Sequence, residues 1–191
     1  MPGEPARRHA TYEDVLTAPE HLVAEVLSGD LYLSPRPAGP HAEASSVLGM
    51  DLGAAFHRGR GGPGGWIILD EPELHFERDI LVPDLGGWLR SRLPAVPASA
   101  HIELAPDWAC EVISPSSARI DRERKLPIYA RERVAHVWLV DPLARTVEVF
   151  RLDGDGYRLV VTRGGTDRVR LEPFGALELE LEALWPTPEP G

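Results

Sequence analysis

The chain has 191 residues, of which 43% are hydrophobic, and it contains one cysteine, Cys110. This length can bury one good core but would leave two independent domains small, and a lone cysteine excludes an internal disulfide. The formal net charge of -10 excludes a broad electrostatic grip on nucleic acid, so any such binding must be local.

The N-terminal third predicts a loose end, a short helix and a hairpin. Residues 1–10 are polar and show no charged-then-apolar leader. No apolar run long enough to span a membrane follows, so we expect a cytoplasmic protein without a membrane segment. A helix is expected at 11–16, capped by Thr11. The triplet Ser28-Gly29-Asp30 predicts a hairpin turn, which places Glu25 in the first strand of that hairpin.

The middle of the chain predicts a long helix and then short strands. Apolar residues recur at helical spacing from Pro40 to Phe56, and a glycine-rich stretch at 59–65 ends the pattern. Turn residues separate three expected strands, at 66–69, 73–77 and 80–83. Residues 88–93 are expected to form a single helical turn, followed by a proline-rich loop.

The next segments predict a buried strand and a basic helix. Residues 108–114 are apolar on both faces of the strand except for Glu111, which is typical of a strand inside a sheet. The basic segment 116–133 should be helical, and Pro127 requires either a kink or a fresh helix start there. Lys125, the only lysine of the chain, would then lie near a helix terminus.

The last strands are expected to complete one sheet. Turns at 153–156 and 164–165 separate them, and they are expected at 137–140, 147–152, 157–162 and 177–181. In the last strand leucines alternate with glutamates, a pattern that suits a half-exposed strand. We therefore expect an α/β protein with one domain over 11–185 and a C-terminal tail at 186–191.

Glu111 is the most informative candidate for chemistry, because an isolated carboxylate among apolar neighbours would cost several kcal/mol to bury. It needs a partner. Asp84 follows an apolar run and offers a second carboxylate, and two such groups would suit Mg²⁺ or Mn²⁺. Lys125 could orient an attacking water and offset negative charge in a transition state. Glu25 could add a further carboxylate if the hairpin packs beside the same sheet edge.

A structural alternative needs no metal. Glu111 would pair with an arginine at 119, 122 or 124, and Asp84 would cap a turn before Gly86-Gly87. Cys110 should point to the opposite face of the strand from Glu111 and belong to the core. The sequence shows no cysteine or histidine cluster with zinc spacing, no phosphate-cradling glycine loop and no Gly-x-Ser-x-Gly elbow, which removes several enzyme classes.

Several motifs in their order resemble the Uma-type restriction endonuclease family, within the PD-(D/E)xK nuclease superfamily. The resemblance extends from Glu25, Gly29, Ser34-Pro35 and His41 to Val147-Glu148-Val149, and it covers roughly residues 11–185. The motifs that carry it are Pro83-Asp84, Glu111-Val112-Ile113-Ser114-Pro115-Ser116-Ser117, Asp121, Lys125, Tyr129-Ala130 and Val137-Trp138-Leu139-Val140-Asp141.

The resemblance implies a restriction-endonuclease-like fold, with a mixed central β-sheet flanked by helices and additional antiparallel hairpins. It also implies Asp84 and Glu111 as metal ligands, Lys125 as a catalytic lysine displaced onto the following helix, and Glu25 as a further acidic catalytic member. The sequence departs from the pattern at Ile113, which stands where the superfamily has its lysine. Two further departures, Arg133 and Val137, concern packing more than chemistry.

The sequence is compatible with three functions. The leading hypothesis is a Mg²⁺- or Mn²⁺-dependent endonuclease that acts on DNA as a homodimer, with Arg119, Arg122, Arg124 and His41 contacting phosphates. The second is a non-catalytic nucleic-acid or protein interaction module that retains the fold, favoured by the overall acidity and by Ile113. A third is a two-carboxylate hydrolase of sugars, against which Lys125 and the basic segment count.

Overall fold

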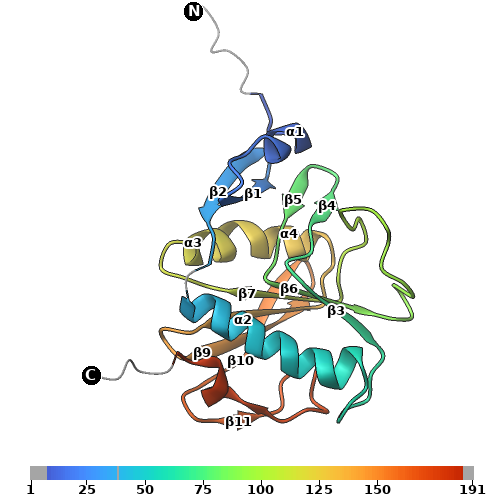
Figure 1. Ribbon diagram of the computed structural model, residues 1–191, viewed down its shortest axis with the longest axis vertical. Helices are drawn as coiled ribbons and strands as arrows, with labels where there is room; N and C mark the ends of the chain where they lie inside the picture. The colour runs from blue at the N-terminus through green and yellow to red at the C-terminus, as the bar shows by residue number, and fades with distance from the viewer. Residues whose placement is uncertain (1–7, 38, 187–191) are drawn as a thin grey trace, which may run out of the picture.

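A six-stranded mixed sheet forms the centre of the computed structural model, which describes residues 8–37 and 39–186 (Figure 1). Its strand order is β10-β9-β8-β7-β6-β3. Only the central pair β7–β8 is parallel, and the other neighbours are antiparallel. The strands are β3 (Trp66–Asp70), β6 (Leu85–Leu89), β7 (Trp108–Val112), β8 (His136–Asp141), β9 (Thr146–Asp153) and β10 (Gly156–Gly164).

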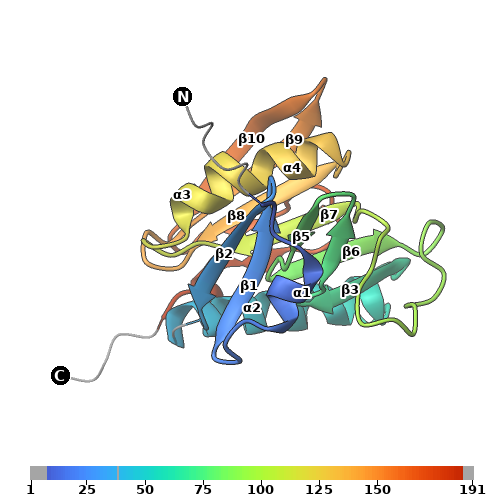
Figure 2. The ribbon, with the colours of Figure 1, turned by 90° about the horizontal axis from the view of Figure 1, so that it is seen from above.

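A second, four-stranded antiparallel sheet has the order β2-β1-β5-β4. It lies beside the helix that α3 and α4 form (Figure 1 and Figure 2). Its strands are β1 (Leu22–Leu27), β2 (Asp30–Pro35), β4 (Leu74–Phe76) and β5 (Asp79–Leu81). The predicted β1–β2 hairpin is confirmed. Its two turn residues, Ser28 and Gly29, have φ of +55° and +82°, the conformation that the tightest hairpin turns require.

Helices cover both faces of the central sheet (Figure 1). The predicted first long helix is α2 (Gly39–Leu52), extended by a π-helical turn η1 (Gly53–His57), and it packs against Trp108, Cys110 and Trp138. On the other face α4 (Leu126–Arg131) packs Ile128 and Tyr129 against Ala109 and Leu139. Alternation along β7 therefore puts Glu111 under α4 and Cys110 under α2, as expected.

The basic segment is helical from Ala118 to Arg131, and Lys125 lies at a boundary within it, as expected: it ends a π-helical turn and is the N-cap of α4, which has Pro127 in its first turn. The segment comprises α3 (Ala118–Ile120), a π-helical turn η2 (Asp121–Lys125) and α4. The wider turn, closed by a hydrogen bond from Leu126 N to Asp121 O, makes room for a proline ring that would clash with a regular α-helix. The kink predicted at Pro127 is thus a π turn just before it.

Two predictions need correction. The helical turn predicted at 88–93 is shorter than expected, because Trp88 and Leu89 belong to strand β6; Leu93 N donates to Leu89 O at 2.9 Å, which closes one turn directly after that strand. The last strand does not join the central sheet. β12 (Leu179–Glu180) pairs instead with β11 (Arg168–Val169), followed by the short helix η3 (Leu181–Leu184), and this segment packs on the α2 face.

The predicted N-terminal helix is confirmed as α1 (Tyr12–Leu16), with Thr11 as its cap and Asp14 accepting the reciprocal hydrogen bond from Thr11 N at 2.8 Å. Within the described residues no helix is both long enough and apolar enough to cross a membrane.

Candidate active site

A cavity of about 490 Å³ opens between the hairpin and the end of the parallel strand pair. Its walls include strands β1 and β2, the segment after β5, the end of β7 with the loop that follows it, and the helix that carries η2. Among its lining residues are Glu25, Asp84, Glu111 and Lys125, the four catalytic candidates expected from the sequence. The fold therefore brings together side chains that lie up to a hundred positions apart in the chain.

Glu111 lies at the buried end of this cavity, with 3% of its surface exposed. Its Oε1 accepts a hydrogen bond from the Tyr129 hydroxyl at 2.5 Å, and its Oε2 accepts one from Lys125 Nζ at 3.0 Å. Both donors come from the helix across the sheet face. The partner that the buried carboxylate requires is thus Lys125, and the alternative in which an arginine at 119, 122 or 124 pairs with Glu111 is wrong.

Lys125 is shared among three carboxylates. Its Nζ lies 2.9 Å from Glu25 Oε1, 3.0 Å from Glu111 Oε2 and 3.6 Å from Asp121 Oδ1. Asp121 and Lys125 are four positions apart, so the π turn places both on the same side of the helix. Val82 N also donates to Glu25 Oε1, at 2.8 Å, which holds the hairpin glutamate in place.

Asp84 occupies the cavity wall next to Glu111. Its Oδ2 accepts a hydrogen bond from Val112 N at 2.7 Å, and its Oδ1 lies 2.5 Å from Nε2 of His41, near the start of α2. Leu85, the next residue, pairs with Cys110 in the sheet, so the backbone fixes Asp84 beside the end of β7. Asp84 does not cap a turn before Gly86-Gly87, as the structural alternative supposed, because those glycines are in β6.

The electrostatics of the cluster are dominated by burial and an excess of carboxylates. Burial, together with the negative charges of Asp121, Asp84 and Glu25, raises the pKa of Glu111 well above its usual value against the opposing effect of Lys125. Burial also raises the pKa of Asp121. Burial alone would lower the pKa of Lys125, but the surrounding carboxylates outweigh it and raise that pKa well above normal.

This excess of negative charge fits a divalent cation. Four carboxylates, those of Glu25, Asp84, Glu111 and Asp121, accompany a single lysine at the cavity. Hard oxygen donors of this kind suit Mg²⁺ or Mn²⁺, and Mg²⁺ is commonly held by only one or two carboxylates together with water and substrate phosphates. Asp84 and Glu111, which both line the cavity, are the residues that would hold it.

The predicted nucleic-acid-binding residues separate into two groups. His41 lines the cavity. The helix residues Arg119, Arg122 and Arg124 are exposed and do not line the cavity. Arg119 Nη1 lies 3.8 Å from Glu123 Oε2, and Arg122 forms an ion pair with Glu148 of β9. Among the described residues, the arginine in the cavity wall is Arg36, whose Nη2 donates to the Glu20 carbonyl at 3.2 Å.

Sequence reasoning missed two members of the cluster. Tyr129 and Asp121 were part of the family pattern without an assigned role. The signal that could have found them is spacing, because 121, 125 and 129 recur every four residues along one helix face. Ser114 and Ser117, which hydrogen-bond each other at the cavity wall, also went unassigned.

Comparisons with known proteins agree with this architecture. A solved structure from Anabaena variabilis ATCC 29413, described as a "putative nuclease belonging to DUF820", superimposes with a TM-score of 0.74 at 22% identity, covering 92% of this chain and 97% of that one. The expected fold class is thereby confirmed. No curated protein matches the sequence. The family model Uma2, described as "Putative restriction endonuclease", matches residues 10–183. The chain belongs to this Uma2 family, as the sequence motifs indicated.

Proposed function

We propose that this protein is a metal-dependent endonuclease that hydrolyses DNA phosphodiester bonds, with Asp84, Glu111, Lys125 and Glu25 as its catalytic residues. One observation carries the proposal: a lysine and three carboxylates are buried in mutual contact at the end of a cavity that Asp84 also lines. Buried charge clusters of this kind are unfavourable for stability alone, which favours a functional role.

Each residue has a distinct task in this proposal. When Mg²⁺ or Mn²⁺ is bound by Asp84 and Glu111, it supplies Lewis-acid stabilisation of negative charge on the phosphate oxygens and acidifies water. The Lys125 ammonium orients the attacking water and offsets charge that grows in the transition state. Glu25 holds Lys125 in place and adds a further carboxylate next to it. Tyr129 fixes one oxygen of Glu111, and His41 fixes one oxygen of Asp84.

DNA would be held locally rather than by a wide basic surface. His41 and Arg36 lie in the cavity wall, and Arg119, Arg122 and Arg124 of the helix are the remaining candidates for phosphate contacts. Arg122 would have to break its ion pair with Glu148 before it could contact a phosphate. Arg124 is therefore the better candidate for a phosphate contact.

The proposal is tested by titration calorimetry of Mn²⁺ into the wild-type protein and into D84N and E111Q. We expect specific binding in the wild type, loss of that binding in both variants, and wild-type binding in the control E43Q, which changes an exposed carboxylate of α2. Mn²⁺-dependent cleavage of a supercoiled plasmid should follow the same pattern.

Substitution of Lys125 distinguishes a loss of catalysis from a loss of metal binding. We expect K125A to abolish plasmid cleavage while Mn²⁺ still binds, because Lys125 is a positive group that contributes no ligand. Circular dichroism must show that the variant is folded, since removing the lysine leaves buried carboxylates unpaired. Full activity in folded K125A would refute the assigned role.

A second function is favoured by a specific observation. The three helix arginines lie outside the cavity and two of them face glutamates, and Ile113 occupies a buried core position where a nuclease lysine is usual. These features suit a non-catalytic interaction module that retains the fold. If the wild type binds no Mn²⁺, either alone or with DNA added, the interaction module is favoured over the metal-dependent endonuclease.

The expected homodimer and cytoplasmic location remain predictions. Cutting both strands of a duplex requires two sites or one site used twice, and a twofold dimer is the simplest way to supply two. Multi-angle light scattering should give twice the chain mass of 21.0 kDa, and a strict monomer at all concentrations would reject the dimer.

A further inference from the structure

Three potential metal ligands converge outside the cavity of the candidate active site. Glu73 and His75 flank Leu74, the first residue of β4, so strand alternation points both side chains to the same side while Leu74 faces the core. His101 belongs to the long loop between β6 and β7 and precedes buried Ile102. The same alternation directs His101 to the side that Glu73 and His75 occupy.

Backbone pairing fixes this convergence. Leu74 and Ile102 form a parallel β-bridge, with hydrogen bonds from Ile102 N to Glu73 O at 2.9 Å and from His75 N to Ile102 O at 3.0 Å. The three side chains are therefore positioned by regular main-chain hydrogen bonds and by two buried apolar anchors. Their approach does not depend on chance contacts between flexible surface groups.

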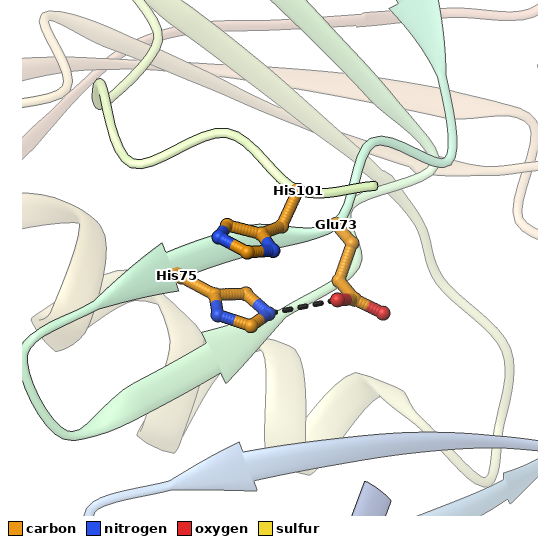
Figure 3. A group of neighbouring side chains, drawn as sticks. All are labelled: Glu73, His75 and His101. Carbon is orange, nitrogen blue, oxygen red and sulfur yellow. Dashed lines mark hydrogen bonds and ion pairs between the residues drawn. The ribbon is translucent and has the colours of Figure 1, made fainter. Parts of the chain in front are cut away.

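The imidazoles of His75 and His101 lie one above the other, with the Glu73 carboxylate beside them (Figure 3). The imidazole rings of His75 and His101 are stacked, with centroids 3.9 Å apart and planes 9° apart, and Glu73 Oε1 lies 2.7 Å from His75 Nε2. One nitrogen or oxygen of each residue lies within 4.8 Å of the others. Tyr12 packs its ring edge-on against His75 at 4.5 Å, which limits how far that imidazole can rotate.

We propose that Glu73, His75 and His101 form a binding site for a zinc-class divalent metal ion. Two imidazole nitrogens and one carboxylate oxygen are donors that select zinc and its transition-metal neighbours over Mg²⁺. Metal–ligand distances of about 2.0–2.2 Å in a tetrahedral site require ligand atoms roughly 3.4 Å apart, and because a metal binds in the plane of an imidazole, the two stacked rings must tilt apart to share one ion. Binding replaces the hydrogen bond between Glu73 and His75 and requires both imidazoles neutral.

The site keeps a coordination position open. Three protein ligands leave a fourth position for water or an exogenous group. His75 lines a cavity of about 910 Å³ together with Tyr12 and Glu103, and Glu103 Oε1 lies 3.9 Å from His101 Nε2. The residues that line this cavity include none of those that line the active-site cavity, so this proposal does not depend on the nuclease proposal.

Sequence reasoning found no zinc spacing because the ligands are not local. Strands β5 and β6 lie between His75 and His101 in the chain, and the Leu74–Ile102 bridge brings the two histidines together. Bound metal would fasten the loop at 90–107, most of which is exposed, to strand β4.

The test uses untagged full-length protein, with Zn²⁺ binding followed by calorimetry and Co²⁺ binding followed by visible absorption. We expect one equivalent bound at this site, in addition to any at the proposed nuclease site, by the wild type and by the matched control H21A, which removes an exposed histidine. H75A and H101A should weaken binding at least tenfold. D84N should bind Zn²⁺ as the wild type does, which separates this site from the proposed nuclease site.

Heteronuclear NMR of the wild-type imidazoles provides a second readout that needs no variant. Zn²⁺ should shift the ring-nitrogen resonances of His75 and His101 and leave those of His21 unchanged, and it should raise the melting temperature of the wild type but not of H101A. Zn²⁺ binding that survives in H75A and H101A, that is lost in D84N, or that leaves both imidazole spectra unchanged would overturn the proposal.

Discussion

At the residue scale, the hydrogen bond between Tyr129 and Glu111 is the contact that most constrains the candidate site. The two oxygens of Glu111 face different donors, and both donors lie on one helix. Tyr129 is fully buried, and its hydroxyl would have no reason to be retained in the core without a charged acceptor. Burial raises the pKa of Tyr129 well above its normal value, so the hydroxyl remains a donor at neutral pH.

We therefore expect Y129F to lower the free energy of unfolding by about 1.5–3 kcal/mol, the contribution of a hydrogen bond to a charged group. It should also weaken Mn²⁺ binding, because Glu111 loses the donor that orients it. Y157F is the matched control, since Tyr157 donates to the neutral Val134 carbonyl at 2.6 Å. That variant should lose only about 0.5–1.5 kcal/mol in urea unfolding and bind Mn²⁺ normally. Equal effects in the two variants would contradict the assigned importance of Tyr129.

The sequence was sufficient to identify the charged residues of the site but not their partners. Glu111 stood out because a carboxylate in an apolar strand needs compensation, and Lys125 stood out as the only lysine. Tyr129 did not stand out, since an inward aromatic residue on a helix is ordinarily packing. In the structure the imidazole of His41, a candidate for phosphate contact, lies against Asp84, and the sequence alone did not reveal this neighbour.

At the element scale, strand β6 shows how packing can override local propensity. Its Gly86-Gly87 pair weakens the strand signal, so the segment after it looked helical. The glycines are required by neighbouring tryptophans: a Cβ on Gly86 would lie 2.8 Å from Cη2 of Trp88 and 2.9 Å from Cγ of Pro72. Such close approach of side chains is set by tertiary structure and leaves no local pattern to read.

G86A should accordingly lower the free energy of unfolding by about 1–3 kcal/mol, the usual cost of overpacking, because Trp88 is fully buried and cannot move aside. G53A is the control. Gly53 is helical and a Cβ there would meet no atom within 4 Å, so this variant should be more stable by about 0.5–1 kcal/mol. Urea denaturation of both variants checks the pair, and a neutral result for G86A would show that the β6 backbone yields more easily than the packing implies.

The π turn in the basic helix is the other element that sequence reasoning resolved only in part. A proline within a basic segment predicted a kink or a new helix start, and both options treat the proline as an interruption. The structure keeps the helix continuous and widens one turn before Pro127, which preserves the four-residue spacing of Asp121, Lys125 and Tyr129 on the buried side. Propensity rules alone do not distinguish these outcomes.

At the scale of the whole molecule, acidity governs how nucleic acid could bind. The net charge of -10 leaves only the few basic residues near the cavity to approach a phosphate backbone. We expect the logarithm of the DNA-binding constant to fall with the logarithm of salt concentration with a slope of roughly -3, corresponding to about three neutralised phosphates.

Fluorescence anisotropy with a short duplex and the cleavage-deficient E111Q variant measures this slope, and R124A should reduce its magnitude by about one. R145A is the control, since Arg145 lies in the β8–β9 turn and does not line the active-site cavity. A slope twice as steep would indicate a wide basic surface and would be inconsistent with local binding.

If the protein is the proposed nuclease, the contact between Glu25 and Lys125 also sets the temperatures at which it could be active. Glu25 belongs to a hairpin whose strand β1 pairs with β5 at the single position Val26–Ile80. Short pairing of this kind opens with less free energy than the central sheet. Each opening would withdraw Glu25 and leave Lys125 with two carboxylates, so competence for cutting would disappear on heating before the core melts. The working temperature range of such an enzyme would be set by its hairpin, and amide hydrogen exchange in β1 would report it.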